Sequence, residues 1–317
     1  MIPQLPFARE LRLSDHQDVE AITSNHPPYC DFNFISLWSW DIDASVRVCL
    51  HHGNLVFRFP DYLSRTPFYM LLGRHRLDDA IHDVMELAAR EGIEPRLQLI
   101  PECVAASLNR IAFVSEPNPD HRDYIIDVQD LAACQGRKWH RQRNFIHRFE
   151  REHPSGKFVQ LDLSSSQIRS RILDVFECWC EQKCGEPSEN IEHEQAALQR
   201  CLEAFASRLV AGGVYVRDKL VAFSLTEEVR NSYAIDHFEK SDRWSHSGVL
   251  QFLQWQVARL LRDRGVRYLN LEQDLGLPGL RRGKQALHPI AYLQKYEIAA
   301  ISESGLAHSH RVAAASL

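Results

Sequence analysis

The sequence contains no apolar run that approaches the roughly 20 residues a helix needs to cross a bilayer. The first ten residues, MIPQLPFARE, lack the basic start and apolar core of a secretory signal peptide. The formal net charge is −5, so the chain has no overall basic field. These absences predict a cytoplasmic protein without a transmembrane segment, in which any nucleic acid must contact a local basic patch.

Cysteine is scarce for a disulfide-stabilised protein, with eight residues in 317. Cys178, Cys180 and Cys184 cluster, but their spacing is not Cys-x-x-Cys and no second pair follows. On a helix, Cys178 and Cys180 would point in nearly opposite directions, so they could not share one ion. His51 and His52 fall in a predicted hairpin turn and are interpreted as turn residues. We therefore expect no metal site.

The composition, 44% hydrophobic and 25% charged, is that of a globular protein long enough for two domains. In the first part, apolar alternation predicts a hairpin, and a 3.6-residue period predicts an amphipathic helix closed by Gly92. Short strands surround that helix, which indicates an α/β domain over residues 1–130. The predicted elements are the hairpin 46–59, the helix 77–90 and the strands 68–72, 97–100 and 124–128.

The most basic stretch is residues 136–153, GRKWHRQRNFIHRFEREH, with six lysines and arginines. On a helix, one face carries basic and polar side chains, and Trp139, Phe145, Ile146 and Phe149 occupy much of the opposite side. This pattern predicts a basic connecting helix within residues 131–155. It is either a solvated connector or a surface for RNA phosphate or a pyrophosphate-bearing cofactor. The basic face comprises Arg137, Arg141, Asn144, Arg148 and Arg151.

Residues 156–300 repeat an α/β order, and residues 301–317 are predicted to be a disordered tail. The predicted strands are 157–163, 214–216, 220–226, 233–239 and 291–298, and the predicted helices are 164–184, 192–210 and 249–264. Gly212-Gly213 is interpreted as the end of the second helix.

The stretch 266–284 places charge at the end of a strand. Residues 266–271 alternate as a buried strand, and Glu272 and Asp274 follow directly. A Gly-Leu-Pro-Gly turn then leads into a short helix, with Pro278 in its first turn. We expect both acids to face a cleft and the helix to return its basic residues toward them; an ordinary solvated strand end is the alternative. The basic residues are Arg281, Arg282 and Lys284.

Two phrases, HFEKSD over residues 237–242 and LEQDLGLPGLRRGK over residues 271–284, resemble the C-terminal domain of phosphatidylglycerol lysyltransferases and their relatives. Asp130-Leu131, Gly136-Arg137-Lys138 and Arg143-Asn144 resemble that family's connecting segment, whereas Leu271 and Gly283 depart from its pattern. The resemblance runs over about residues 5–300. It implies a mixed α/β fold with two tandem N-acetyltransferase-like (GNAT-type) domains joined by the basic helix, and it fixes neither donor nor acceptor.

We favour transfer of an aminoacyl group from aminoacyl-tRNA to an amine or hydroxyl acceptor. The ester donor is already activated, and the sequence has no Gly-x-Ser-x-Gly nucleophile motif. Glu239, Glu272 and Asp274 are the expected bases, although an interstrand Glu239–Lys240 ion pair is an alternative interpretation. Donor and substrate contacts are expected from Arg137, Lys138, Arg141, Arg143, Asn144, Lys240, Arg243, Gly248, Gln273, Arg281, Arg282 and Lys284.

Two other functions remain open. An acyl-CoA-dependent N-acyltransferase would share the implied fold, but only Arg243 and Gly248 match its usual phosphate-loop pattern, and at a different spacing. A non-catalytic pair of domains that binds an anionic ligand is the other alternative. No tightly bound cofactor is expected. A small molecule or a lipid headgroup could serve as the acceptor, and the sequence specifies neither the acceptor nor the oligomeric state.

Overall fold

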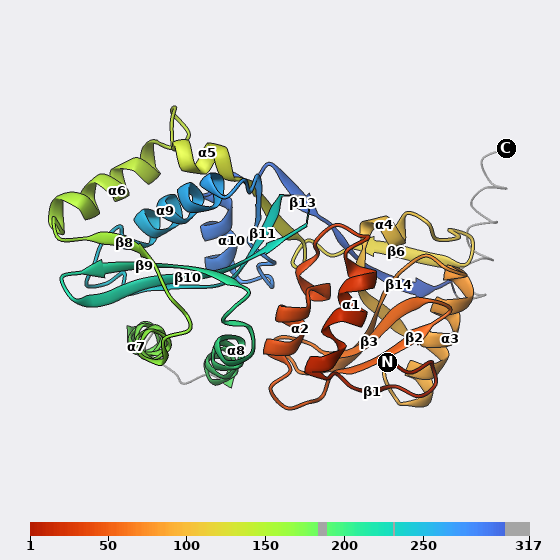
Figure 1. Cartoon of the computed structure of the whole chain (residues 1–317). Helices are drawn as coiled ribbons and strands as arrows, with labels where there is room; N and C mark the ends of the chain where they lie inside the picture. The colour runs from red at the N-terminus through yellow and green to blue at the C-terminus, as the bar shows by residue number, and fades with distance from the viewer. Residues whose placement is uncertain (183–188, 231, 302–317) are drawn as a thin grey trace, which may run out of the picture. The chain divides into compact units, whose positions relative to one another are not determined.

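A computed structural model describes residues 1–182, 189–230 and 232–301. The chain divides into two compact units, and both are discontinuous in sequence (Figure 1). The first comprises residues 1–29, residues 43–122 and the C-terminal segment from Leu293. The second comprises residues 30–42 and 123–292. Each unit contains one mixed seven-stranded sheet.

The sheet of the first unit contains strands from both the N-terminal and the C-terminal parts of the chain. Its strand order is β1 (Arg9–Glu10), β2 (Arg47–His51), β3 (Asn54–Pro60), β4 (Pro67–Leu72), β5 (Arg96–Pro101), β14 (Lys295–Ala300) and β6 (Phe113–Pro117). Its helices are α1 (His16–Thr23), α3 (Leu77–Arg90) and α4 (Glu102–Ala105). α3 has the predicted bounds and buries Ile81, Val84, Met85 and Ala88, which confirms its apolar stripe.

The sheet of the second unit has the order β13 (Ala291–Leu293), β7 (Asp123–Asp127), β12 (Tyr268–Asn270), β11 (Tyr233–Ser241), β10 (Lys219–Val229), β9 (Leu209–Val216) and β8 (Lys157–Gln160). β11 and β12 are parallel, and α9 (Val249–Asp263) makes the connection between them. The parallel pairing covers only Tyr233–Ile235 against Tyr268–Asn270. Beyond it, β11 continues for six residues without β12 beside it.

Helices cover both faces of the second sheet (Figure 1). α5 (Val128–Ala133), α6 (His140–Glu152) and α9 lie on one face, where Trp139, Ile146, Phe149 and Phe252 belong to one buried cluster. α7 (Ser166–Gln182) and α8 (Glu189–Phe205) lie on the other face. α2 (Phe34–Trp40) packs on α8, and α10 (Pro278–Gln285) follows β12.

Several sequence predictions need correction. The strand predicted at residues 124–128 in the first domain is β7, at residues 123–127, in the second unit's sheet. The single strand expected over 291–298 is two strands in different sheets, and β6 was not predicted. Residues 209–213 belong to β9 rather than to a helix. The Gly212 position packs against the Phe158 ring, where a Cβ atom would approach within 2.8 Å. Cys184 and residues 302–317 lie outside the described residues.

The basic helix is part of the second unit's core. α6 buries Ile146 and Phe149 and packs against α9. The expected segments 1–130, 131–155 and 156–300 therefore differ from the compact units. Across residues 1–182, 189–230 and 232–301, no helix combines the length and apolarity that a bilayer crossing requires.

Candidate active site

A β-bulge at His237 organises the site. Leu225 of β10 pairs with Phe238, but the next residue, Thr226, pairs with Asp236, so β11 has one extra residue at His237. In a regular strand, residues 236 and 239 would point to opposite faces, because side chains alternate. A bulge breaks this alternation. Asp236 and Glu239 consequently share the α9 face of the sheet.

Contacts confirm that the two acids share one face. Asp236 accepts a 2.9 Å hydrogen bond from Ser224 Oγ, and Glu239 accepts a 2.8 Å bond from Gln254 of α9. Burial raises the pKa of Asp236 to about 6. Burial and the neighbouring charge of Asp236 raise the pKa of Glu239 to about 8. At pH values between these two, the pair holds one proton.

Lys284 lies among these acids, at the point where β11 and β12 separate. Its ammonium group donates hydrogen bonds to the carbonyl oxygens of Leu271 and Gln273, just after β12. Burial lowers the pKa of Lys284, although the charges of Glu272 and Asp236 oppose this shift. α10 therefore returns a cation to the end of the strand, as the sequence predicted.

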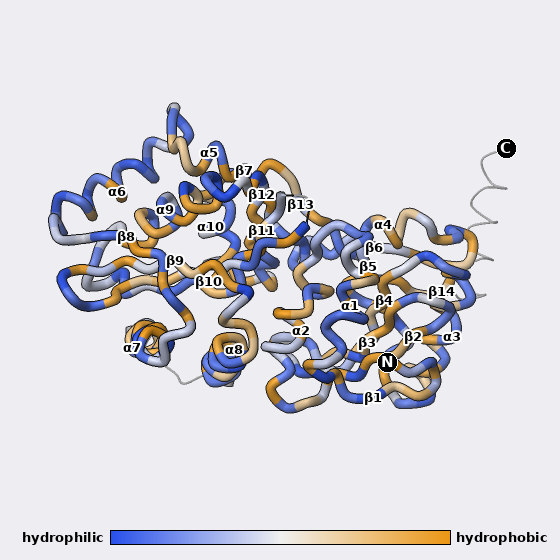
Figure 2. Tube along the Cα trace, in the orientation of Figure 1, coloured by the Kyte–Doolittle hydropathy of each residue, from blue (hydrophilic) through white to orange (hydrophobic). Residues whose placement is uncertain are grey.

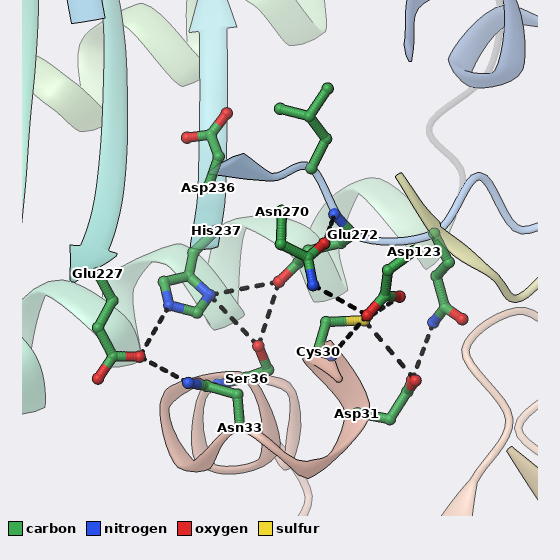
Figure 3. A network of polar contacts seen from close by, with 12 residues as sticks. Cys30, Asp31, Asn33, Ser36, Asp123, Glu227, Asp236, His237, Asn270 and Glu272 are labelled. Atoms are coloured by element: carbon green, nitrogen blue, oxygen red, sulfur yellow. Dashed lines mark hydrogen bonds and ion pairs between the residues drawn. The ribbon is translucent and has the colours of Figure 1, made fainter. Parts of the chain in front are cut away.

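On the opposite face of β11, His237 connects two carboxylates (Figure 3). Its Nδ1 atom lies 3.3 Å from Glu272 Oε1 and from Ser36 Oγ, and its Nε2 atom lies 3.5 Å from Glu227. Asn33 and Arg208 also donate to Glu227, at 2.6 and 2.8 Å. Although burial lowers the pKa of His237, the nearby carboxylates of Glu227 and Glu272 raise it to about 9. The two carboxylates therefore favour the protonated imidazole.

Glu272 occupies a strained position at the end of β12. Its φ angle of 61° lies in the left-handed region, where a residue with a side chain costs about 1–3 kcal/mol. A 2.7 Å bond from its amide to Asn270 Oδ1 holds this geometry. The carboxylate points to Ser36 and His237, so Glu272 belongs to the His237 network (Figure 3).

The sequence analysis expected Asp274 to face a cleft, but the structure encloses its side chain. Its side chain has 0% exposure, and Arg281 donates two hydrogen bonds to it, at 2.9 and 2.8 Å. The Tyr124 hydroxyl and the Gly276 amide also donate to it. Burial opposes ionisation, but these donors hold the pKa of Asp274 below its ordinary value. This environment anchors the 271–276 loop to α10.

A second buried group comes from the segment before α2. Asp31 accepts a bond from Gln273, at 3.1 Å, and Asp123 accepts one from Asn270, at 3.0 Å. The Cys30 amide and thiol both approach Asp123, at 2.8 and 3.0 Å. Cys30, Asp31 and Asp123 are close enough to hold a metal ion together. In this structure, their hydrogen bonds link residues 30–31 to β7 and to the end of β12 (Figure 3).

The alternative interpretation of Glu239 and Lys240 as an ion pair does not hold, because the two side chains bond to helices on opposite faces of the sheet. Lys240 bonds to Glu194 of α8 at 2.7 Å and lies 4.5 Å from the centroid of the Trp179 ring. Gly248 precedes α9 with φ +86°, and a Cβ atom there would lie 2.2 Å from the Phe145 carbonyl oxygen. The role of Gly248 in this structure is close packing of α9 on α6.

Most residues along α6 are hydrophilic (Figure 2). Arg141, Asn144, Arg148 and Arg151 are exposed, as are Arg137 and Lys138 just before the helix, which confirms the predicted face. Arg143 instead donates to the carbonyls of Cys134 and Gly136, so it stabilises the preceding turn. Arg243 and Arg282 are exposed on other segments.

Two glutamines connect α6 to the acid pair. Gln142, buried on α6, donates to Gln254 at 3.3 Å, and Gln254 donates to Glu239 at 2.8 Å. A cavity of about 820 Å³ lies elsewhere in this unit, and its lining includes His153, Arg171, Lys219 and His246 but neither acid of the pair.

The family comparison covers most of the chain. Residues 30–299 match the family described as phosphatidylglycerol lysyltransferase, C-terminal. The chain belongs to this family. The match confirms the resemblance predicted from the two phrases, one of which contains Glu239 and the other Glu272 to Lys284. No curated protein matches the chain.

Solved structures show the same fold as this member of the phosphatidylglycerol lysyltransferase family. A conserved protein of unknown function from Bacteroides thetaiotaomicron is 26% identical, with a TM-score of 0.80 over 95% of this chain and 100% of that one. The C-terminal domain of a putative lysylphosphatidylglycerol synthetase from Agrobacterium fabrum is 14% identical, with a TM-score of 0.64 over 95% and 96%. L-PGS from Bacillus licheniformis is 16% identical, with a TM-score of 0.61 over 92% and 93%.

Sequence reasoning missed several polar residues of this family member's site. Asp236 and His237 stand beside the recognised Glu239, but strand alternation hides the face that Asp236 shares with it. Asp31, Ser36 and Asp123 come from distant segments, and only pairing in three dimensions brings them near β12. A usable signal was the pair of polar residues Asp31 and Asn33 inside an aromatic-rich segment.

Proposed function

We propose that this chain transfers an aminoacyl group from aminoacyl-tRNA to an amine or hydroxyl acceptor, at the acid pair Asp236–Glu239. Family membership supports the class of reaction, since the family description names a lysyltransferase. The observation that carries the proposal is the pair itself: two carboxyls on one sheet face, with pKa values raised to about 6 and about 8, beside a lysine.

The reaction needs one proton to move from the acceptor to the leaving group. The acceptor nitrogen or oxygen forms a bond to the ester carbonyl carbon and loses its proton to a base. The tetrahedral intermediate then breaks the bond between that carbon and the ribose oxygen, which leaves with a proton. A pair of carboxyls that holds one proton near neutral pH can accept the first proton and donate the second.

The environments of the two acids assign the roles. Asp236, which has the lower pKa of the two acids, is the base that takes the acceptor's proton. Glu239, with a pKa of about 8, is protonated at neutral pH and donates to the ribose oxygen. Gln254 orients the Glu239 carboxyl, and Gln142 in turn orients the Gln254 amide.

Lys284 supplies positive charge for the oxyanion of the intermediate. An ammonium group has three donors. Its two described hydrogen bonds go to the carbonyls of Leu271 and Gln273 and hold the group in place. A fixed donor aimed at developing charge costs little reorganisation during the reaction, so it stabilises the transition state more than the substrate.

The exposed basic residues of α6 and of the turn just before it are the proposed contact for the tRNA backbone. Arg137, Lys138, Arg141 and Arg148 gather positive charge on a chain whose net charge is −5. Phosphate contacts of this kind position a nucleic acid without reading its sequence. Gln142, on the buried side of the same helix, bonds to Gln254, which bonds to Glu239 of β11. Hydrogen bonds therefore connect the helix of the proposed donor contact to the acid pair.

Single-turnover transfer from radiolabelled aminoacyl-tRNA to a panel of amine and lipid acceptors tests the proposal. We expect Asp236→Asn to lower the rate about a hundredfold or more, since general-base catalysis contributes on that order. Glu203→Gln, an exposed change on α8, is the control and should leave the rate unchanged. Transfer from acyl-CoA but not from aminoacyl-tRNA would replace this proposal with the acyl-CoA alternative. Equal rates in Asp236→Asn and wild type would remove Asp236 from the mechanism.

A further inference from the structure

Two histidines and an aspartate converge on the surface of the first unit, which contains none of the residues that the proposed reaction uses. His51 Nε2 lies 2.7 Å from Asp83 Oδ2, and His52 Nε2 lies 3.6 Å from the same oxygen. The two imidazole rings have centroids 4.0 Å apart. The ligand atoms of all three residues lie within 4.8 Å of one another.

The chain holds both histidines on a tight turn. His51 ends β2, and His52-Gly53 forms the turn to β3 with φ angles of +49° and +81°. Positive φ at both central residues is the signature of a type I′ hairpin, where asparagine is preferred at the first position. Histidine at position 52 accepts the left-handed conformation and directs its ring toward that of His51.

A buried asparagine fixes this turn relative to α3. Asn54, with 0% exposure, donates to the carbonyl of His51 at 3.0 Å and to that of His75 at 2.7 Å. Its Oδ1 atom accepts the His75 amide at 2.9 Å. α3 begins two residues after His75 and carries Asp83. The imidazoles and the carboxylate are therefore held by one rigid frame.

We infer that His51, His52 and Asp83 bind a divalent transition-metal ion of the zinc class. Two imidazole nitrogens and a carboxylate oxygen are ligands that zinc prefers, and three protein ligands leave a fourth position for water. Tetrahedral ligand atoms lie about 3.3 Å apart when each is about 2.0 Å from the ion. The present separations approach this geometry, and binding would replace the His51–Asp83 hydrogen bond with two metal bonds.

Solvent can reach the three side chains, whose exposures are 13%, 24% and 45% for His51, His52 and Asp83. An ion bound here would crosslink the β2–β3 hairpin to α3. It would stabilise the folded first unit in proportion to its affinity, because the unfolded chain does not hold these ligands together. The sequence analysis treated both histidines only as turn residues, a role that they also have.

The test uses the full chain without a histidine tag, stripped with EDTA and titrated with Zn²⁺ against a chromophoric chelator. We expect one ion per chain at this site. His52→Asn keeps a residue suited to positive φ and removes the imidazole, and Asp83→Asn keeps the shape and removes the charge. Each should weaken binding at least tenfold. His82→Asn, on the exposed side of α3, is the matched control and should bind as wild type does.

Absence of stoichiometric binding to the wild-type chain would overturn the inference. So would equal affinity in wild type, His52→Asn and Asp83→Asn, because the ion would then occupy another position. A Co²⁺ titration of the wild-type chain adds a measurement that depends on no variant. A tetrahedral nitrogen and oxygen site gives a visible absorption band, and a titration without this band contradicts the proposed coordination.

Discussion

The carboxyl groups of this site differ in their hydrogen bonds and burial, and these differences suit them to different roles. Asp236 and Glu239 each accept one described side-chain hydrogen bond, and burial raises their pKa values. Asp274 accepts from an arginine, a tyrosine and a backbone amide, and its pKa is lowered. A carboxyl whose ionised form is fully satisfied is a weak base, so Asp274 is better suited to holding the loop.

Replacing Glu239 with glutamine tests the shared proton. In the wild-type protein, the rate of the proposed transfer should fall below about pH 6, where both acids are protonated, and above about pH 8, where neither is. In Glu239→Gln the upper limb should disappear and the lower limb should stay, because Asp236 still titrates. The measurement is the single-turnover rate between pH 5 and pH 9 with one fixed acceptor. An unchanged upper limb would assign that ionisation to another group.

Asp274→Asn should affect stability more than chemistry. The change leaves the Arg281 guanidinium without its buried partner, which we expect to cost about 1–3 kcal/mol of unfolding free energy. Urea denaturation measures this loss. The transfer rate per folded molecule should stay within a few-fold of wild type. A hundredfold loss of rate with unchanged stability would return Asp274 to the role of base that the sequence suggested.

At the scale of elements, α6 combines a buried apolar side with an exposed basic side. The triple change of Arg137, Arg141 and Arg148 to alanine should weaken tRNA binding and flatten its dependence on salt. The slope of log K against log salt should fall by up to about 2–3, since each lost phosphate contact contributes about 0.7–0.9. Filter binding at several salt concentrations measures it. The control replaces Arg90 and Arg110, exposed in the first unit, and should keep the slope.

The contact between α6 and α9 depends on a residue without a side chain. In Gly248→Ala, the new methyl group would meet the Phe145 carbonyl oxygen, and φ of +86° would be strained. We expect a loss of about 1–3 kcal/mol in unfolding free energy. Gly283→Ala is the matched control: it lies within α10 with open space around it, so it should be neutral or stabilising by up to about 1 kcal/mol. Thermal denaturation compares the two, and equal shifts would contradict this account.

Elements that depend on local pattern were predicted well. α3, the β2–β3 hairpin and α9 have strong periodicity, and the structure places them within one residue or two of their predicted bounds. β9 was misjudged at Gly212-Gly213, because glycines that end a helix and glycines that allow close packing look the same in sequence. Close packing against Phe158 and Leu161 explains both glycines.

At the scale of the whole molecule, each unit is built from segments that are not consecutive in the sequence, and no local sequence pattern reveals this. Residues 30–42 precede most of the first unit yet belong to the second, and β14 returns to the first sheet after β13 has completed the second. These assignments depend on pairing between strands that are more than a hundred residues apart in the sequence. For the same reason, the sequence identified Glu239, Glu272 and Lys284 but not Asp31, Ser36 or Asp123.

Stability should depend on pH through His237. Its folded pKa of about 9 exceeds its ordinary value of 6.5, so the folded chain binds this proton more tightly than the unfolded chain does. The stabilisation is fully present below pH 6.5 and is lost as pH rises through 9. Urea denaturation between pH 6 and pH 9.5 should show this decline. His237→Gln should be less stable at pH 6 and show a flatter profile; a profile parallel to wild type would exclude His237 as its source.

The extra residue in β11 has a consequence for reading related sequences. Asp236 and Glu239 point to the same face of the sheet, although they are three residues apart. The bulge residue between them does not count, so they occupy positions two apart along the strand. The acid pair thus depends on the number of residues between the two acids and on the strand register, as well as on the residue types. A relative that kept the three-residue spacing but lost the bulge would retain the letters of the motif and place the two acids on opposite faces. Deletion of one residue together with the bulge would leave them on one face. The spacing of the two acids must therefore be read together with the strand register at residues 236–239 to tell which members place both acids on one face.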